Sequence, residues 1–106
     1  MTPQQEANVL VHNLWGYDDT DYRVLRNRMV TTRAKHACDI CFGGIAPGSR
    51  VRASTEVYDG ICKTFRVCPE CCEAILNDQH DGDCNHMEAR TQLGMKRAAR
   101  RLEGER

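Results

Sequence analysis

Two pairs of cysteines, each separated by two residues, constrain the fold of this 106-residue chain more than any other feature. The first pair is Cys38 and Cys41, the second is Cys68 and Cys71, and 26 residues lie between the pairs. Two thiolates at this spacing can bind one metal ion from a tight turn, and two such pairs complete a tetrahedron. A thioredoxin-type redox motif instead needs one pair within a βαβ unit, which this sequence lacks. We therefore predict one structural metal site.

Zinc is the metal that we expect at this site. Thiolate ligands favour zinc over calcium or magnesium, which prefer oxygen, although iron in a rubredoxin-like site uses the same four ligands. The chain has two Phe, one Trp and 41% hydrophobic residues including seven cysteines, and a small domain with so lean a core needs a metal or disulfides. An odd number of cysteines cannot all pair internally. With no secretory signal and no apolar run of roughly 20 residues, we expect a cytoplasmic protein without a membrane span.

The segment between the cysteine pairs is predicted to form a β-hairpin. Residues 50–58 and 61–67 have alternating patterns and flank Asp59-Gly60, a strong hairpin signal. Pro69 then suits the first turn of a helix over residues 70–77. One face of the first strand is expected to carry Val51, Ala53, Thr55 and Val57.

A metal knuckle, a hairpin and a helix with the second ligand pair follow one another in the order of a treble clef. The matching motifs are Cys-Asp-Ile-Cys at 38–41, Gly43-Gly44-Ile45, Pro47-Gly48, Tyr58-Asp59-Gly60 and Cys-Pro-Glu-Cys at 68–71. With these motifs, residues 36–75 resemble the small treble-clef or zinc-ribbon-like proteins of bacteriophages and other mobile elements. The resemblance covers about 40 of the 106 residues and implies Cys38, Cys41, Cys68 and Cys71 as zinc ligands.

Residues 1–35 are predicted to form an αα-hairpin. The first helix is expected to begin at a capping box opened by Thr2 and to stop near Gly16. A second helix is predicted over residues 20–34, after an acidic cap at residues 18–21. The expected apolar sides are Ala7, Leu10, Val11 and Leu14 on the first helix and Tyr22, Leu25 and Met29 on the second.

A basic helix is predicted near the C-terminus, over residues 87–102, with Gly94 weakening its middle. The predicted fold is thus a small α+β zinc-stabilised module forming one compact unit. Its parts are a helical hairpin at 1–35, a treble-clef-like centre at 36–78, and a loop with the C-terminal helix at 79–106. The expected apolar stripe of that helix consists of Met95, Ala98, Ala99 and Leu102.

Three cysteines remain outside the predicted site. Cys62 lies in the second predicted strand and is expected to be a small packed side chain. A second metal site is the less favoured interpretation of the others, because their spacing with two histidines matches no standard pattern; the candidates are Cys72, His80, Cys84 and His86.

Charge is segregated along the chain although 15 basic residues balance 15 acidic ones. Residues 1–22 carry four acids and no base, whereas residues 23–36 carry five bases and no acid. Such blocks are either solvated faces or contacts to phosphate or a partner, and sequence favours neither. The candidate contacts are Arg23, Arg26, Arg33, Arg90, Arg97, Arg100 and Arg101.

No catalytic set is recognisable. An HNH nuclease, which a treble clef can host, needs a histidine base on the hairpin, and no histidine lies between Ala37 and Gln79. Zinc held by four thiolates also has no open coordination position. We therefore expect a non-enzymatic protein without a small-molecule substrate.

Two functions from different classes are compatible with these features. The favoured one is a phage-type accessory protein that binds and modulates a host or viral protein or a nucleoprotein complex. Inhibition of a defence system such as CRISPR interference is one role of this kind. The alternative is a DNA- or RNA-binding zinc-finger regulator that uses its basic helices. Balanced charge and few aromatic residues count against the alternative.

Overall fold

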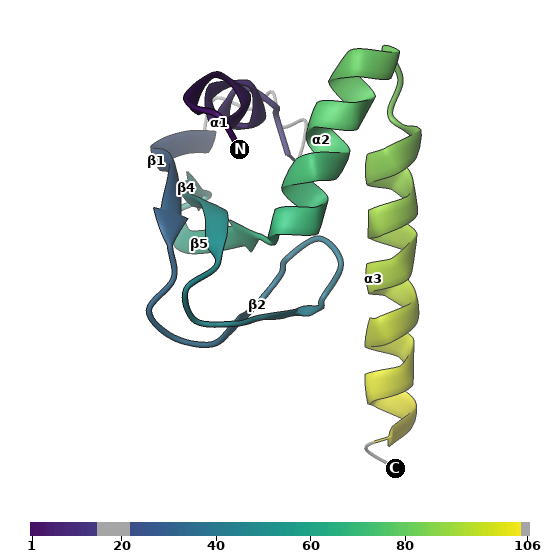
Figure 1. Cartoon of the computed structure of the whole chain (residues 1–106). Coiled ribbons are helices and arrows are strands. Elements are labelled where there is room, and N and C mark those ends of the chain that lie inside the picture. Colours follow the sequence, from purple (N-terminus) through teal and green to yellow (C-terminus); the bar gives the residue numbers. More distant parts are fainter. Residues whose placement is uncertain (15–21, 105–106) are drawn as a thin grey trace.

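The computed structural model describes residues 1–14 and 22–104, which form a small α+β fold (Figure 1). Two helices pack side by side at one end, and strands and a shorter helix make up the rest. The elements in chain order are α1 (Pro3–Leu10), β1 (Tyr22–Thr31), β2 (His36–Ala37), β3 (Gly44–Ile45), β4 (Arg50–Tyr58), β5 (Ile61–Val67), α2 (Pro69–Asp81) and α3 (Asn85–Gly104).

The predicted hairpin is confirmed and forms two strands of an antiparallel sheet with the order β1-β4-β5. Its turn residues Asp59 and Gly60 both have positive φ angles, 51° and 77°, which matches the twist of a two-residue hairpin loop. A second, two-stranded ribbon pairs β2 with β3, and the first cysteine pair lies between these two short strands.

The predicted αα-hairpin is wrong, because residues 22–31 form the edge strand β1 and not a helix. This strand pairs with β4 along its length, from Tyr22 opposite Tyr58 to Thr31 opposite Arg50. It therefore belongs to the same sheet as β4 and β5, which lie between the two cysteine pairs in the chain. The expected stop and acidic cap, Gly16 and residues 18–21, lie outside the described residues.

Helix α1 forms as predicted at its N-terminus, where Thr2 and Gln5 make the capping box. Its buried side chain is Val9, at 0% exposure, whereas Val11 from the expected stripe is 78% exposed. The helix ends at Leu10, so the apolar spacing that was counted through residue 14 extends beyond the helix.

Hydrogen bonds from buried and half-buried polar side chains of the sheet hold α1 in place. Arg52 is only 4% exposed, and its Nη1 donates to the carbonyl of Val9 at 3.0 Å. Its Nε donates to Oδ1 of Asn27 at 2.9 Å, and that amide donates to the carbonyl of Leu10 at 2.7 Å. A cation thus caps the C-terminal end of α1, where the helix dipole favours positive charge.

The predicted face of β4, formed by Val51, Ala53, Thr55 and Val57, is the less buried face of the strand, although Val51 itself is fully buried. Arg52, Ser54 and Glu56 are buried, whereas Ala53, Thr55 and Val57 on the opposite face are only partly buried. The buried carboxylate of Glu56 accepts hydrogen bonds from Ser54 and Tyr22. The remaining core joins side chains from the helices, the sheet and the ribbon, including Val9, Ile45, Val51, Val67 and Ile75.

Helices α2 and α3 lie side by side and run in opposite directions (Figure 1). Gly82, with φ of 73°, ends α2 in the left-handed conformation. The carboxylate of Asp78 then accepts hydrogen bonds from the amides of His86 and Met87, at 2.8 and 2.9 Å, in the first turn of α3. In the described part of the chain, no helix has the length and apolar character needed to cross a bilayer.

The predicted apolar stripe of α3 is not the face that packs. Met95 is 66% exposed, whereas Gly94 is buried. A Cβ atom on Gly94 would lie 2.2 Å from the carbonyl oxygen of Ile40, so the backbone of α3 touches the first cysteine turn directly. The side chain of Leu102 lies outside the described residues.

Candidate metal centre

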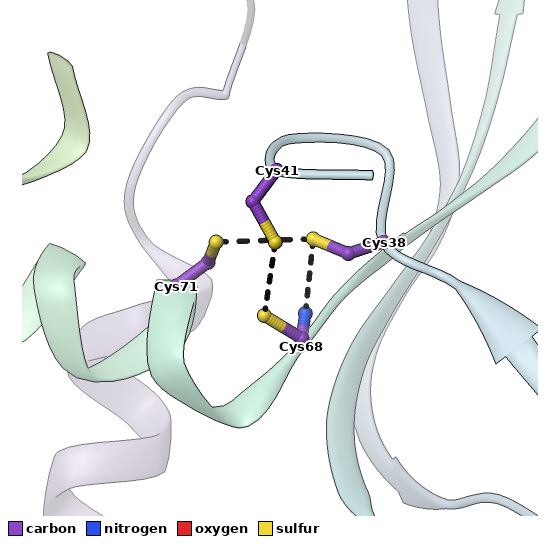
Figure 2. A group of neighbouring side chains, drawn as sticks. All are labelled: Cys38, Cys41, Cys68 and Cys71. Atoms are coloured by element: carbon purple, nitrogen blue, oxygen red, sulfur yellow. Dashed lines mark hydrogen bonds between the residues drawn. The ribbon is translucent and has the colours of Figure 1, made fainter. Parts of the chain in front are cut away.

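The four predicted ligands converge on one point between the β2–β3 ribbon and the start of α2 (Figure 2). All four side chains are buried, with exposures of 0% for Cys38, 1% for Cys41, 3% for Cys68 and 0% for Cys71. Their sulfur atoms lie within 4.8 Å of one another, and none of them is in a disulfide. The four cysteines could therefore hold one metal ion.

The sulfur positions fit a tetrahedral ion. The Sγ atoms of Cys38 and Cys71 are 3.8 Å apart, and those of Cys41 and Cys68 are 3.7 Å apart. A tetrahedron with metal–sulfur bonds of about 2.3 Å has sulfur–sulfur edges of about 3.8 Å. These two pairs therefore already have the spacing of opposite edges of such a site.

The first ligand pair is held by a tight turn. The amide of Cys38 donates to the carbonyl of Gly43 at 2.9 Å, and the amide of Phe42 donates to the carbonyl of Cys38 at 3.0 Å. Phe42 has a φ angle of 55°, a left-handed conformation that reverses the chain after Cys41. The turn aims both sulfurs back toward α2.

The second pair is positioned by the start of α2. Cys68 is the N-cap residue, and Cys71 lies in the first turn after Pro69. The amides of Ile40 and Cys68 both donate to Sγ of Cys38 at 3.4 Å. Such N–H groups favour the thiolate form that metal binding requires.

Two arginines of α3 contact this centre. Nε of Arg90 donates to Sγ of Cys71 at 3.4 Å, and this contact raises the pKa of Arg90. Nη1 of Arg97 donates to the carbonyl of Cys41 at 3.0 Å. Four thiolates around a divalent cation carry a net charge of about −2, so a guanidinium beside them offsets part of that charge. Arg90 and Arg97, predicted as contacts to a partner or to nucleic acid, thus donate hydrogen bonds to the cysteine cluster and its first turn.

The close approach of the four sulfurs opposes ionisation of all four thiols together, because like charges repel one another. The side-chain interactions of Cys38 with Cys68 and Cys71 lower the pKa of Cys38. The same interaction with Cys38, together with burial, raises the pKa of Cys68 and raises that of Cys71 to about 12. The cluster without metal therefore retains protons that a bound cation would displace.

The structure does not bring the candidates for a second site together. Cys72 is fully buried but does not belong to the cysteine cluster; its Sγ donates to the carbonyl of Val67 at 3.5 Å, and burial raises its pKa to about 11. Cys84 is exposed. His80 and His86 each contact Asp81, at 3.2 and 2.9 Å. In residues 1–14 and 22–104, the one group of three or more metal-ligating side chains is the four-cysteine cluster.

The other predicted contacts are exposed and lie on two separate elements. Arg23 and Arg26 are on β1, and Arg33 follows it, whereas Arg100 and Arg101 are on α3. Sequence reasoning missed that Arg66 on β5 shares a face with Arg26 and Arg28, because this follows only from the strand register. Cys62 is exposed on β5, so its predicted packing is wrong.

Comparison of the chain with protein-family models, with curated proteins and with solved structures gives no match. The assignment of a function therefore depends on the residues and their geometry.

Proposed function

We propose that Cys38, Cys41, Cys68 and Cys71 bind one zinc ion and that this ion has a structural role in a treble-clef arrangement. Two of the sulfur–sulfur distances match the edges of a tetrahedral site, and the four side chains are at most 3% exposed, and both observations support the proposal. Four protein thiolates fill the coordination shell of zinc and leave no position for water or substrate. A zinc ion in such a site stabilises the folded state and takes no part in catalysis, so we propose that the protein is not an enzyme.

The proposed role of the folded module is that of a phage-type accessory protein, acting in the cytoplasm of a host cell. It binds and modulates a host or viral protein or a nucleoprotein complex, and inhibition of a defence system such as CRISPR interference is one role of this kind. The observation that carries the binding role is an exposed apolar patch at the turn end of the sheet. Ile61 is 70% exposed and Tyr58 44% exposed, beside a shallow hollow of about 190 Å³ lined also by Phe65.

This patch has the character of a protein contact. Aromatic and aliphatic side chains form the centre of protein interfaces, and charged groups surround them. Lys63 lies over the ring of Phe65, at 4.8 Å from its centre, and Glu56 also lines the hollow. The patch therefore combines exposed apolar anchors with a cation at its edge.

Affinity capture tests this proposal. The zinc-loaded chain is used to recover partners from a lysate of host cells after nuclease treatment. We expect a stoichiometric protein partner that the variant Ile61→Asp fails to recover. Met95→Asp is the matched control, because Met95 is 66% exposed but lies on α3, away from the patch. Recovery of background proteins alone, or equal recovery by Ile61→Asp, would contradict the proposal.

A further inference from the structure

The face of the sheet opposite the buried Arg52 carries a cluster of basic side chains. Arg26 and Arg28 on β1 and Arg66 on β5 line one shallow groove of about 330 Å³. The strand register places them together, because Arg28 and Arg66 both lie opposite Ala53 on the central strand. Residues directly opposite one another in a sheet project from the same face.

The spacing of these arginines suits a row of phosphates. Alternate residues along a strand are about 7 Å apart, and strands separated by one other strand are about 10 Å apart. Arg26 and Arg28 are alternate residues of β1, and Arg66 is two strands away. Three guanidinium groups therefore project from an area about 10 Å across.

No acidic side chain lines this groove, and the carboxylate that borders it, that of Asp39, accepts a hydrogen bond from the backbone amide of Arg66 at 2.7 Å. None of its lining residues is Asp or Glu, and within the described chain the ion pairs involve Arg50, His80 and His86 instead. The hydroxyls of Thr55 and Thr64 hydrogen-bond to each other at 3.0 Å on its floor. In a protein with zero net charge, this face is thus a local positive surface.

The basic surface continues past the end of β1. Thr32 and His36 both line the groove, and the exposed residues Arg33 and Lys35 lie in the short connection between them. Five Arg and Lys residues thus line this groove or follow it in the chain, and an imidazole lies at its end. We call this surface the arginine face; its members are Arg26, Arg28, Arg33, Lys35, His36 and Arg66.

The composition of the groove favours a duplex over other polyanions. Arginine forks bind phosphate oxygens in a bidentate manner, and hydroxyl groups add donors. No Phe, Tyr or Trp side chain lines the groove, and the one imidazole, of His36, lies at its end, whereas single-strand binders stack successive bases on aromatic platforms. Its apolar members, Val30 and Ala53, are small, so it lacks the anchors of a protein interface.

We propose that the arginine face binds the sugar–phosphate backbone of a nucleic-acid duplex without reading its sequence. This inference goes beyond the proposed protein contact, which uses Tyr58 and Ile61 at the turn end of the sheet. If the partner of the proposed function is a nucleoprotein complex, the arginine face is the surface that contacts its nucleic acid. It also moves the expected phosphate contacts from basic helices to a sheet.

Fluorescence anisotropy of a labelled, random-sequence DNA duplex tests the inference on the zinc-loaded full chain. Across a potassium chloride series, we expect the logarithm of the association constant to fall with log salt with a slope of about −3, for three neutralised phosphates. Arg26→Gln with Arg28→Gln should weaken binding at low salt by about tenfold or more and reduce the slope by about 2. The matched control removes the same charge from α3, through Arg100→Gln with Arg101→Gln, and should change affinity by less than about twofold.

Three results would overturn the inference. They are no duplex binding at low salt, equal losses in the sheet and α3 double variants, and tighter binding of single strands or of polyglutamate than of the duplex. The substituted arginines of β1 are exposed, and a thermal melt of each variant confirms that it remains folded. Arg66→Gln is the second variant for the sheet, and it should reduce the slope by about 1. Protein capture after nuclease treatment is measured separately, so failure of one proposal leaves the other intact.

Discussion

Gly94 is the position where the structure makes the most counterintuitive prediction. It lies inside helix α3, where replacing glycine with alanine ordinarily stabilises a protein by about 1 kcal/mol. Here, however, the new Cβ would lie 2.2 Å from the carbonyl oxygen of Ile40 and 3.0 Å from Cα of Cys41. Both contacts are with backbone, which cannot rotate away as a flexible side chain can.

The size of the effect follows from these distances. An ordinary contact of about 3.4 Å or more requires α3 to move about 1 Å away from the cysteine turn, and such overpacking costs about 1–3 kcal/mol. The movement also stretches the hydrogen bonds from Arg90 and Arg97 to the metal centre, each worth about 1 kcal/mol. After subtracting the helix-propensity gain, we expect Gly94→Ala to lower stability by about 2 kcal/mol and the melting temperature by about 10 °C.

The assay is thermal unfolding of metal-saturated protein followed by circular dichroism. Gly44→Ala is the control, because no atom lies within 4 Å of a Cβ at that position and its φ is not positive. We expect its melting temperature to change by much less than that of Gly94→Ala. If Gly94→Ala melts at or above the temperature of the unsubstituted protein, the higher helix propensity of alanine outweighs any overpacking, and the proposed close contact is wrong.

Three further predictions concern the buried polar network and the cysteines. Arg52→Met leaves the carbonyl of Val9 and the amide oxygen of Asn27 without their buried donor, so the free energy of unfolding in urea should fall by about 2–4 kcal/mol. An unchanged value would refute the role of Arg52 in holding α1 on the sheet. Cys71→Ser should lower the metal content of purified protein, whereas Cys72→Ala should leave it unchanged by elemental analysis, and equal losses would contradict the assignment of ligands. Acid should release the metal, because protons compete with the ion for the thiols and the pKa values of Cys68 and Cys71 are raised. The affinity for zinc, measured by chelator competition, should therefore fall from pH about 8 to about 5.5. An affinity that does not change with pH would count against thiolate ligands.

The parts of the fold that the sequence predicts well depend on local signals. The cysteine spacing, the Asp59-Gly60 turn, Pro69 at the start of α2 and the capping box at Thr2 all involve residues within a few positions of one another. Each corresponds to one short-range geometry, so no knowledge of the distant chain is needed.

Strand β1 could not be predicted in the same way, because its partners on β4 lie far along the chain, from Thr31 opposite Arg50 to Tyr22 opposite Tyr58. A register shift between Val24 and Arg26 leaves Leu25 as an extra, 53% exposed residue, which breaks the alternation that reveals a strand. Tyr22, Leu25 and Met29 then have helical spacing by coincidence. Pairing with β4 outweighs the weak helical preference of this segment.

The candidate site likewise has parts that the local sequence predicts and parts that depend on contacts between distant segments. All four ligands follow from the motif, whereas the contacts of Arg90 and Arg97 with the cluster follow from how α3 packs. The neighbouring sequence does not show that Gly94 contacts the first cysteine turn, and it predicts only that this glycine weakens the helix. The arginine face needed the register of three strands before Arg66 could be placed beside Arg28.

The metal content of the purified chain tests the central claim most directly. We predict one equivalent of zinc per chain and no iron, measured by elemental analysis of folded protein expressed without added metal. Removal of that zinc by a strong chelator should unfold the sheet and α2, with loss of the circular dichroism signal, and added zinc should restore it. A folded protein that contains well under one equivalent of zinc, and whose spectrum and melting temperature do not respond to the chelator, would contradict the account.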